Sequence, residues 1–173
     1  IGGVVESLPG IEASACTSGT RWAWDNVAFS ILHPGPDGHR HGNDGSCVIR
    51  IETADGQGIL LTGDIERTSE QALLLDSQAV AADLLVVPHH GSLTSSTPEF
   101  VQAVKPRIAL FSAGYRNRYR LPRPAVVQRY ADAGAVMYHT GRDGAITVKL
   151  RPGAGAPEIS LWRSVSRHYW SAG

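Results

Sequence analysis

Two groups of side chains that can bind a metal each follow an apolar segment of the chain. Asp64 ends the first segment, 59–64, whereas His89 and His90 come directly after the second, 83–87. In open α/β sheets ligands bind at the carboxyl ends of strands, because the strand interior is packed and only its end opens into a crevice. A carboxylate and two imidazoles are suitable donors for a divalent cation. The sequence therefore predicts a metal site that Asp64 and the histidine pair share.

A turn is the other interpretation of Asp64. A Gly-Asp pair after a strand is common as a turn or a helix N-cap, so Asp64 alone predicts no ligand. A His-His-Gly-Ser sequence directly after an apolar strand is much rarer by chance, and the combination favours the metal site. Because adjacent residues of an extended strand point to opposite faces, we expect only one histidine to reach the ion, and we favour His90. His89 is then a supporting or substrate-contacting neighbour.

The hydrophobic pattern predicts a mixed sheet with helical cover, an α/β (α+β) fold. The first two strands after 27–32 form a hairpin whose turn is Asp55-Gly56, and their mostly apolar composition indicates cover on both faces. Thr97 is expected to cap a helix that begins with Pro98. The expected strands are 27–32, 47–53, 57–61, 83–87, 107–112, 135–138, 144–150 and 158–163, and the expected helices are 66–77, 97–104 and 122–133. The tryptophans at 22, 24, 162 and 170 are expected in the core or covering the sheet.

Composition is consistent with one domain over 1–173, since 42% of the residues are hydrophobic. Basic and acidic residues balance at 16 each, which removes the simplest argument for a nucleic-acid binder. No apolar run approaches the roughly 20 residues that cross a bilayer. Cys16 and Cys47 are compatible with a disulfide or with two buried thiols, and the sequence does not decide between them.

Arginines nevertheless gather in one short segment. Arg116, Arg118 and Arg120 alternate with Tyr115 and Tyr119. Such a composition suits a phosphodiester backbone with a stacked base. A solvated loop in which the arginine stems lie on the surface explains the same residues equally well.

Three motifs together resemble the metallo-β-lactamase-like domain of the DNA-uptake competence protein ComEC: Leu-Thr-Gly-Asp-Ile-Glu at 61–66, Val-Pro-His-His-Gly-Ser at 87–92 and Arg-Asp-Gly-Ala-Ile at 142–146. The segments 16–27 and 31–34 extend the likeness over nearly the whole chain. The resemblance implies an αββα sandwich, a divalent-metal site between its two sheets and a proposed nuclease activity on DNA. It also implies attachment to a polytopic channel of the bacterial inner membrane, with this domain on the periplasmic side.

The chain departs from the family pattern at two places. The family's His-x-Asp-x-Asp-His metal motif ends immediately before an Ile-Gly-Gly, and this chain starts with Ile1-Gly2-Gly3. We therefore expect a domain truncated at its N-terminus that lacks several ligands. Asn117 to Pro122 resembles an Asn-x-Tyr-Gly-His-Pro motif in which Leu121 replaces the histidine, and a leucine cannot bind a metal.

The resemblance and the residue patterns together give the expected site. The intact parent is expected to hold Mn or Zn and to process the non-imported DNA strand, whereas this chain alone is expected to bind no metal and to be inactive. The alternative is a degenerate, non-catalytic module that binds or guides single-stranded DNA. The expected partners are DNA, as a single strand or duplex, and the rest of the channel, with no small-molecule cofactor.

Ser46 lies where the wider superfamily places a histidine and is expected to hydrogen-bond a loop instead. The expected catalytic residues are Asp64 and His90, the metal ligands Asp64, His89 and His90, the DNA-binding residues Arg116, Asn117, Arg118, Tyr119 and Arg120, and the supporting residues Asn43, Ser46, Ser92 and Asp143.

Overall fold

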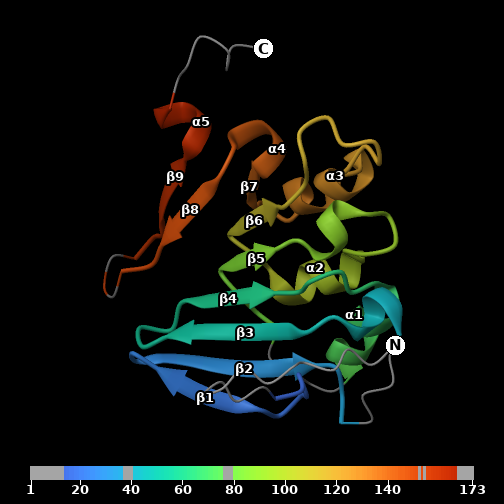
Figure 1. Ribbon diagram of the computed structural model, residues 1–173, viewed down its shortest axis with the longest axis vertical. Helices are drawn as coiled ribbons and strands as arrows, with labels where there is room; N and C mark the ends of the chain where they lie inside the picture. Colours follow the sequence, from blue (N-terminus) through green and yellow to red (C-terminus); the bar gives the residue numbers. More distant parts are fainter. Residues whose placement is uncertain (1–13, 37–40, 76–79, 152, 154, 167–173) are drawn as a thin grey trace, which may run out of the picture.

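A seven-stranded mixed sheet organises the protein. The computed structural model describes residues 14–36, 41–75, 80–151, 153 and 155–166. Figure 1 shows the sheet strands following one another in chain order, with a separate two-stranded hairpin beside the β7 end. The sheet strands are β1 (Arg21–Trp24), β2 (Val27–His33), β3 (Val48–Thr53), β4 (Gly58–Leu61), β5 (Leu84–Val86), β6 (Ile108–Phe111) and β7 (Val136–His139), and the hairpin strands are β8 (Ile146–Lys149) and β9 (Glu158–Leu161).

The direction of strand pairing changes at β4. Strands β1 to β4 pair antiparallel, because short turns such as Asp55-Gly56 reverse the chain. Strands β4 to β7 pair parallel, because a helix returns the chain between successive strands. The connecting helices are α1 (Arg67–Leu75), α2 (Pro98–Val104) and α3 (Pro124–Asp132), and the shorter helical segments are η1 (Gly42–Gly45), η2 (Pro88–Gly91), α4 (Thr140–Asp143) and α5 (Trp162–Val165).

Helices α1, α2 and α3 cover one face of the sheet and form the core with it. The buried strand residues Leu60, Leu85 and Ala109 lie in one row across β4, β5 and β6. The helices contribute Leu73, Phe100, Val101, Val104, Val126 and Tyr130 to the same core. Thr97 caps α2 as predicted, since its hydroxyl accepts a hydrogen bond from the amide of Phe100 at 3.3 Å.

The opposite face of the sheet is also apolar. Side chains alternate along a strand, so the residues on either side of the buried row point away from the helices. Most of them are only partly buried, and Val136 is 55% exposed. Two rows cross this face, Ile31, Ile49, Leu61, Val86, Leu110 and Tyr138 in one, and Phe29, Ile51, Ile59, Leu84, Ile108 and Val136 in the other.

Several local predictions are wrong. Trp24 and Trp162 are 76% and 59% exposed rather than buried, whereas Trp22 covers the sheet by stacking on Phe29 with 5.0 Å between ring centroids. Strand β1 is absent from the sequence prediction, and the last strand ends at Leu161, where α5 begins. The short helix at residues 140–143 is likewise absent from the sequence prediction. Trp170 and the end of the helix predicted at 66–77 lie outside the described residues. Within the described residues no helix is long and apolar enough to span a membrane.

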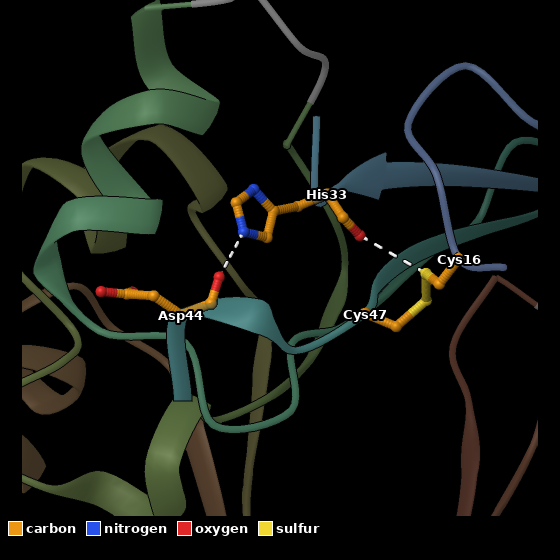
Figure 2. The surroundings of a disulfide bond; sticks show 4 residues. All are labelled: Cys16, His33, Asp44 and Cys47. Atoms are coloured by element: carbon orange, nitrogen blue, oxygen red, sulfur yellow. Dashed lines mark hydrogen bonds between the residues drawn. A yellow bond between two sulfur atoms is a disulfide. The ribbon is translucent and has the colours of Figure 1, made fainter. Parts of the chain in front are cut away.

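Cys16 and Cys47 form a disulfide, which resolves the alternative that the sequence left open. The bond joins the segment before β1 to the residue that precedes β3. Figure 2 shows two neighbouring contacts: the His33 ring lies 2.8 Å from the backbone oxygen of Asp44, and the His33 carbonyl oxygen faces Cys16 at 3.5 Å. The disulfide therefore borders the loop that carries Asn43, Asp44 and Ser46.

We expect the double variant Cys16→Ser/Cys47→Ser to lose about 4 kcal/mol of unfolding free energy. The bond spans 31 residues, and a cross-link of that length restricts the unfolded chain by about this amount. Urea denaturation followed by circular dichroism measures the change. The unsubstituted protein in excess reductant should unfold at the variant's midpoint, and equal midpoints for oxidised protein and variant would contradict the prediction.

Candidate metal centre

The site lies where β4 and β5 end side by side. These strands pair in parallel register, with Leu61 opposite Val86. Two hydrogen bonds continue the pairing beyond the strands: the Thr62 hydroxyl donates to the Val86 carbonyl at 2.7 Å, and the His89 amide donates to the Gly63 carbonyl at 3.1 Å. The segments that follow both strands are therefore held together at one edge of the sheet.

Asp64 and His90 face each other at this edge. His90 Nε2 lies 3.4 Å from Asp64 Oδ1, longer than a strong charge-assisted hydrogen bond. The His90 and Asp64 side chains are 45% and 44% exposed, so solvent reaches both donor groups. An oxygen and a nitrogen donor from two different strand ends thus converge on one accessible position, as the sequence predicted.

The two histidines occupy an unusual turn rather than a continuation of β5. His89 has φ 48° and ψ 41°, and His90 has φ 56° and ψ 18°, both in the left-handed region. For non-glycine residues this conformation costs about 1–2 kcal/mol each, and such strain tends to gather at functional sites. The alternation rule of an extended strand therefore does not apply here, because the strand has already turned. His90 nevertheless reaches Asp64, whereas His89 turns to Glu66.

His89 is held by polar neighbours on both ring nitrogens. Its Nδ1 lies 3.1 Å from Glu66 Oε1 and 3.1 Å from Thr94 Oγ1, and its Nε2 lies 3.4 Å from Asn43 Nδ2. Asn43 and Thr94 also donate to Glu66, at 3.2 and 2.9 Å. Both nitrogens of the His89 ring therefore already have polar partners, and His90 is the better-placed nitrogen ligand for a metal. Glu66 was absent from the predicted site residues, although an acid two residues after Asp64 was a visible signal.

The loop between β2 and β3 fixes the segment that carries Asp64. Ser46 Oγ accepts a hydrogen bond from the Asp64 amide at 3.1 Å, the loop interaction predicted for it. The Asp44 carboxylate accepts from the Glu66 amide at 3.0 Å and from the Ser69 hydroxyl at 2.6 Å, at the start of α1. Asp44 thereby satisfies backbone donors at the beginning of that helix, which its own residues leave unpaired.

Buried polar groups hold the segment that follows the histidines. The Glu70 carboxylate accepts from the amides of Ser96 and Thr97, the latter at 2.8 Å. Arg129 donates to the Ser96 carbonyl at 2.7 Å from the opposite side. Burial raises the pKa of Glu70, and the amide hydrogen bonds and Arg129 act in the other direction. The backbone after the histidine turn is therefore anchored to α1 and to α3.

The remaining supporting residues divide between two places. Ser92 stays near the site, where its hydroxyl lies 3.1 Å from that of Thr94. Asp143 accepts from the His139 amide at 2.8 Å and from Arg142 Nε at 2.7 Å, and these contacts lie within β7 and α4. The Arg142 guanidinium lowers the pKa of Asp143. The hydrogen bonds of Asp143 among the described residues therefore connect it to neither Asp64 nor His90.

The predicted DNA-binding residues lie in the loop between β6 and α3. Arg116, Arg118, Tyr119 and Arg120 are exposed, whereas Asn117 is half-buried. The Asn117 amide donates to the Gly114 and Leu121 carbonyls at 3.0 and 2.7 Å and accepts from the Leu121 amide at 2.9 Å. Asn117 therefore braces the loop from within, and Leu121 takes part in this bracing through its backbone.

The donor chemistry at Asp64 and His90 suits a divalent cation, but two donors do not close a coordination shell. Over the described ranges no group of three or more His, Cys, Asp or Glu side chains is placed to hold a metal. Asp64 and His90 alone therefore offer too few donors to complete a metal site.

The histidine turn depends on Gly91. Its φ is 82°, and a Cβ there would lie 2.6 Å from the Pro122 Cβ. Gly134 provides a matched control, because its φ is 77° and nothing lies within 4 Å of the position that a Cβ would take there. We expect Gly134→Ala to lose about 1 kcal/mol of unfolding free energy from backbone strain. Gly91→Ala should lose about 2 kcal/mol more, because overpacking adds to the strain. Chemical denaturation of both variants checks this, and equal losses would contradict the close approach of Gly91 and Pro122.

Comparison with known proteins finds relatives that are much longer than this chain. No family model matches it. It is 42% identical over 137 residues, 78% of its length, to the uncharacterized protein YcaI of Escherichia coli K12. It is 34% identical over 172 residues, 98% of its length, to competence protein ComA of Neisseria gonorrhoeae, and 34% identical over 136 residues, 78% of its length, to recombination protein 2 of Haemophilus influenzae. The chain spans only 18%, 24% and 17% of these three relatives. It is therefore homologous, over most or nearly all of its length, to a segment of larger proteins that include a named competence protein.

Proposed function

We propose that this chain is a domain of a DNA-uptake protein of bacterial competence, and that it contributes Asp64 and His90 to a divalent-metal site that acts on DNA phosphodiesters. The observation that carries the proposal is the 3.4 Å approach of a carboxylate oxygen and an imidazole nitrogen at the ends of adjacent parallel strands. The names of the relatives supply the biological setting. The likeness to the ComEC domain supplies the reaction class.

Mn or Zn is the proposed cation, and Asp64 and His90 are the residues of this chain that would hold it. When bound, such an ion lowers the pKa of a coordinated water to about 7 and neutralises charge that develops on a phosphate. Other residues of the chain hold Asp64 and His90 in place for the cation. Ser46 fixes the backbone of Asp64, and the strained turn directs His90 toward it. His89, whose ring centroid lies 6.3 Å from that of His90, is the residue that we expect to contact a bound substrate beside the metal.

The missing ligands are proposed to come from a second sheet layer. The face of the sheet opposite the helices carries two apolar rows, most of whose residues are only partly buried, as expected for a surface that another sheet covers. Packing of a second sheet there would complete the αββα sandwich of the metallo-β-lactamase-like fold. The relatives are four to six times longer than the matched segment, which leaves room for such a layer.

The disulfide supports a position on the periplasmic side of the inner membrane. Disulfides form and persist in oxidising compartments and are rare in the bacterial cytosol. Cys16 and Cys47 are bonded across 31 residues. The remainder of the proposed protein, a membrane channel that takes in one DNA strand, is its expected partner.

A second candidate function is a non-catalytic module that guides single-stranded DNA. Leu121, which stands where the ComEC pattern has a histidine, favours it. This leucine is half-buried in the loop 114–121 between β6 and α3, which we call the arginine loop, and its side chain offers no donor atom to a metal. The two candidates differ in whether the complete protein holds a metal.

Metal binding by a longer version of the protein tests the first candidate. The 173-residue chain should bind Mn or Zn only weakly, whereas a version that includes the expected His-x-Asp-x-Asp-His motif should bind it stoichiometrically in calorimetry. Asp64→Asn in the longer version should weaken binding more than about 100-fold, because loss of a direct ligand costs more than loss of a residue that only orients one. Metal-dependent cleavage of labelled DNA should fall in parallel.

Asp25→Asn is the matched control for this substitution. Asp25 is exposed in the β1–β2 turn, with φ 51° that asparagine also tolerates. Unchanged metal affinity in Asp64→Asn, or no bound metal in the longer version, would exclude the enzyme and favour the guiding module. Appreciable metal-dependent cleavage by the 173-residue chain alone, abolished by Asp64→Asn, would contradict the need for further ligands.

A further inference from the structure

An arginine-lined cavity lies at the β6–β7 end of the sheet, separate from the Asp64–His90 pair. Its volume is about 720 Å³. The loop 114–121 forms one wall, and residues after β7 and from α5 form the other. The arginines that line it are Arg116, Arg118, Arg120, Arg142 and Arg163.

The cations of this cavity come from distant parts of the chain. Arg163, from the last described helix, donates through Nη1 to the Gly141 and Arg142 carbonyls at 2.6 and 3.2 Å. Its guanidinium carbon also lies 5.1 Å from the centroid of the Tyr115 ring, at the start of the arginine loop. Arg163 therefore contacts both walls of the cavity. The alternation of arginine and tyrosine in 115–120 gave no sign of this role, because Arg163 lies far from that segment in the sequence.

The loop presents its arginines in a fixed shape. Asn117 braces it through three hydrogen bonds to its own backbone, and Arg116 and Arg120 adopt left-handed φ values of 48° and 54°. Arg116 and Arg118 lie over the Tyr115 and Tyr119 rings, at 5.1 and 4.7 Å from the centroids. Such contacts restrict the guanidinium groups, so that less entropy is lost when an anion binds.

The positive charge in the cavity is largely uncompensated. Arg142 is paired with Asp143 at 2.7 Å. Within the described part of the chain no carboxylate pairs with the other four arginines: Arg116, Arg118, Arg120 and Arg163. Arg163 also keeps its Nε and Nη2 hydrogens without a described acceptor. Converging guanidinium groups with free donors suit phosphate oxygens, which accept paired N–H bonds.

We propose that this cavity binds phosphates of a single-stranded nucleic acid, and that Arg163 is a central contact. The choice of a nucleic acid as ligand rests on the DNA-uptake role proposed above. The charge balance and geometry point to phosphate independently of that role. Several cations along a cavity of this size match consecutive phosphates of a strand better than one small anion.

Fluorescence anisotropy with a labelled 20-nucleotide thymidylate strand tests the proposal on the 173-residue chain, in EDTA so that no metal contributes. Arg163→Gln and Arg116→Gln should each weaken binding about tenfold at low salt, because each removes charge-assisted hydrogen bonds. Each should also flatten the dependence of log affinity on log salt by about 0.7. Arg21→Gln, the same charge change at the exposed β1 edge, should alter affinity less than about twofold.

The proposal would be overturned by the absence of binding at low salt or by equal losses in Arg163→Gln and Arg21→Gln. Binding to anionic lipid vesicles that Arg163→Gln weakens as strongly as binding to the strand would also overturn it. Competition by inorganic pyrophosphate distinguishes whether the natural ligand is a nucleic-acid strand or a small phosphate compound. Displacement of the strand by pyrophosphate at equal phosphate concentration would indicate a small-molecule pocket and would contradict the proposal of a nucleic-acid ligand. Because the assay contains no metal, its failure leaves the metal proposal standing, and an empty metal site leaves this cavity proposal standing.

Discussion

The parallel pairing of β4 with β5 is the constraint on which the candidate site depends. Because Leu61 lies opposite Val86, both strands end at the same level, and a shift of one residue would reverse the faces of their side chains. The Thr62 and His89 hydrogen bonds continue the register past the strands. These bonds hold the Asp64 segment and the histidine turn in one place, although 26 positions separate Asp64 from His90 in the chain. The positions of the two donor groups are therefore determined by sheet geometry, and their local sequences only choose which atoms are presented.

The loop 42–47 stabilises this arrangement from the other side. Asp44 satisfies donors at the start of α1, Ser46 accepts the Asp64 amide, and Asn43 reaches both Glu66 and His89. The disulfide at Cys47 fixes the end of the same loop against the segment before β1. A loop with few apolar residues has little core to hold it, so a covalent bond and hydrogen bonds must replace packing. The order of the candidate metal site is thus tied to an oxidised cysteine pair that touches neither proposed ligand.

Local patterns predicted most of the strands and helices, because apolar runs, the Asp55-Gly56 turn and the Thr97-Pro98 cap act over a few residues. The approach of Asp64 to His90 also followed from the general position of ligands at strand ends. The left-handed conformations of His89 and His90 did not, because tertiary contacts rather than residue preference hold non-glycine residues there. The roles of Glu66 and Arg163 depend on neighbours from other elements. Nor does a sequence distinguish an exposed Trp24 from a buried one, and the disulfide depends on a Cα–Cα distance of 5.9 Å that spacing alone cannot give.

The overall charge of zero hides a separation of charge along one rim of the sheet. Asp64 and Glu66 follow β4, whereas the arginines that pair with no carboxylate of the described residues gather near the ends of β6 and β7. The two regions are joined, since the Arg123 amide donates to the Gly91 carbonyl at 3.0 Å beside the contact of Gly91 with Pro122. A polyanion is attracted to the arginine end and repelled by the carboxylates at the other. A cation bound between Asp64 and His90 would offset that repulsion, so under our proposals the metal site and the arginine cavity would each attract phosphate.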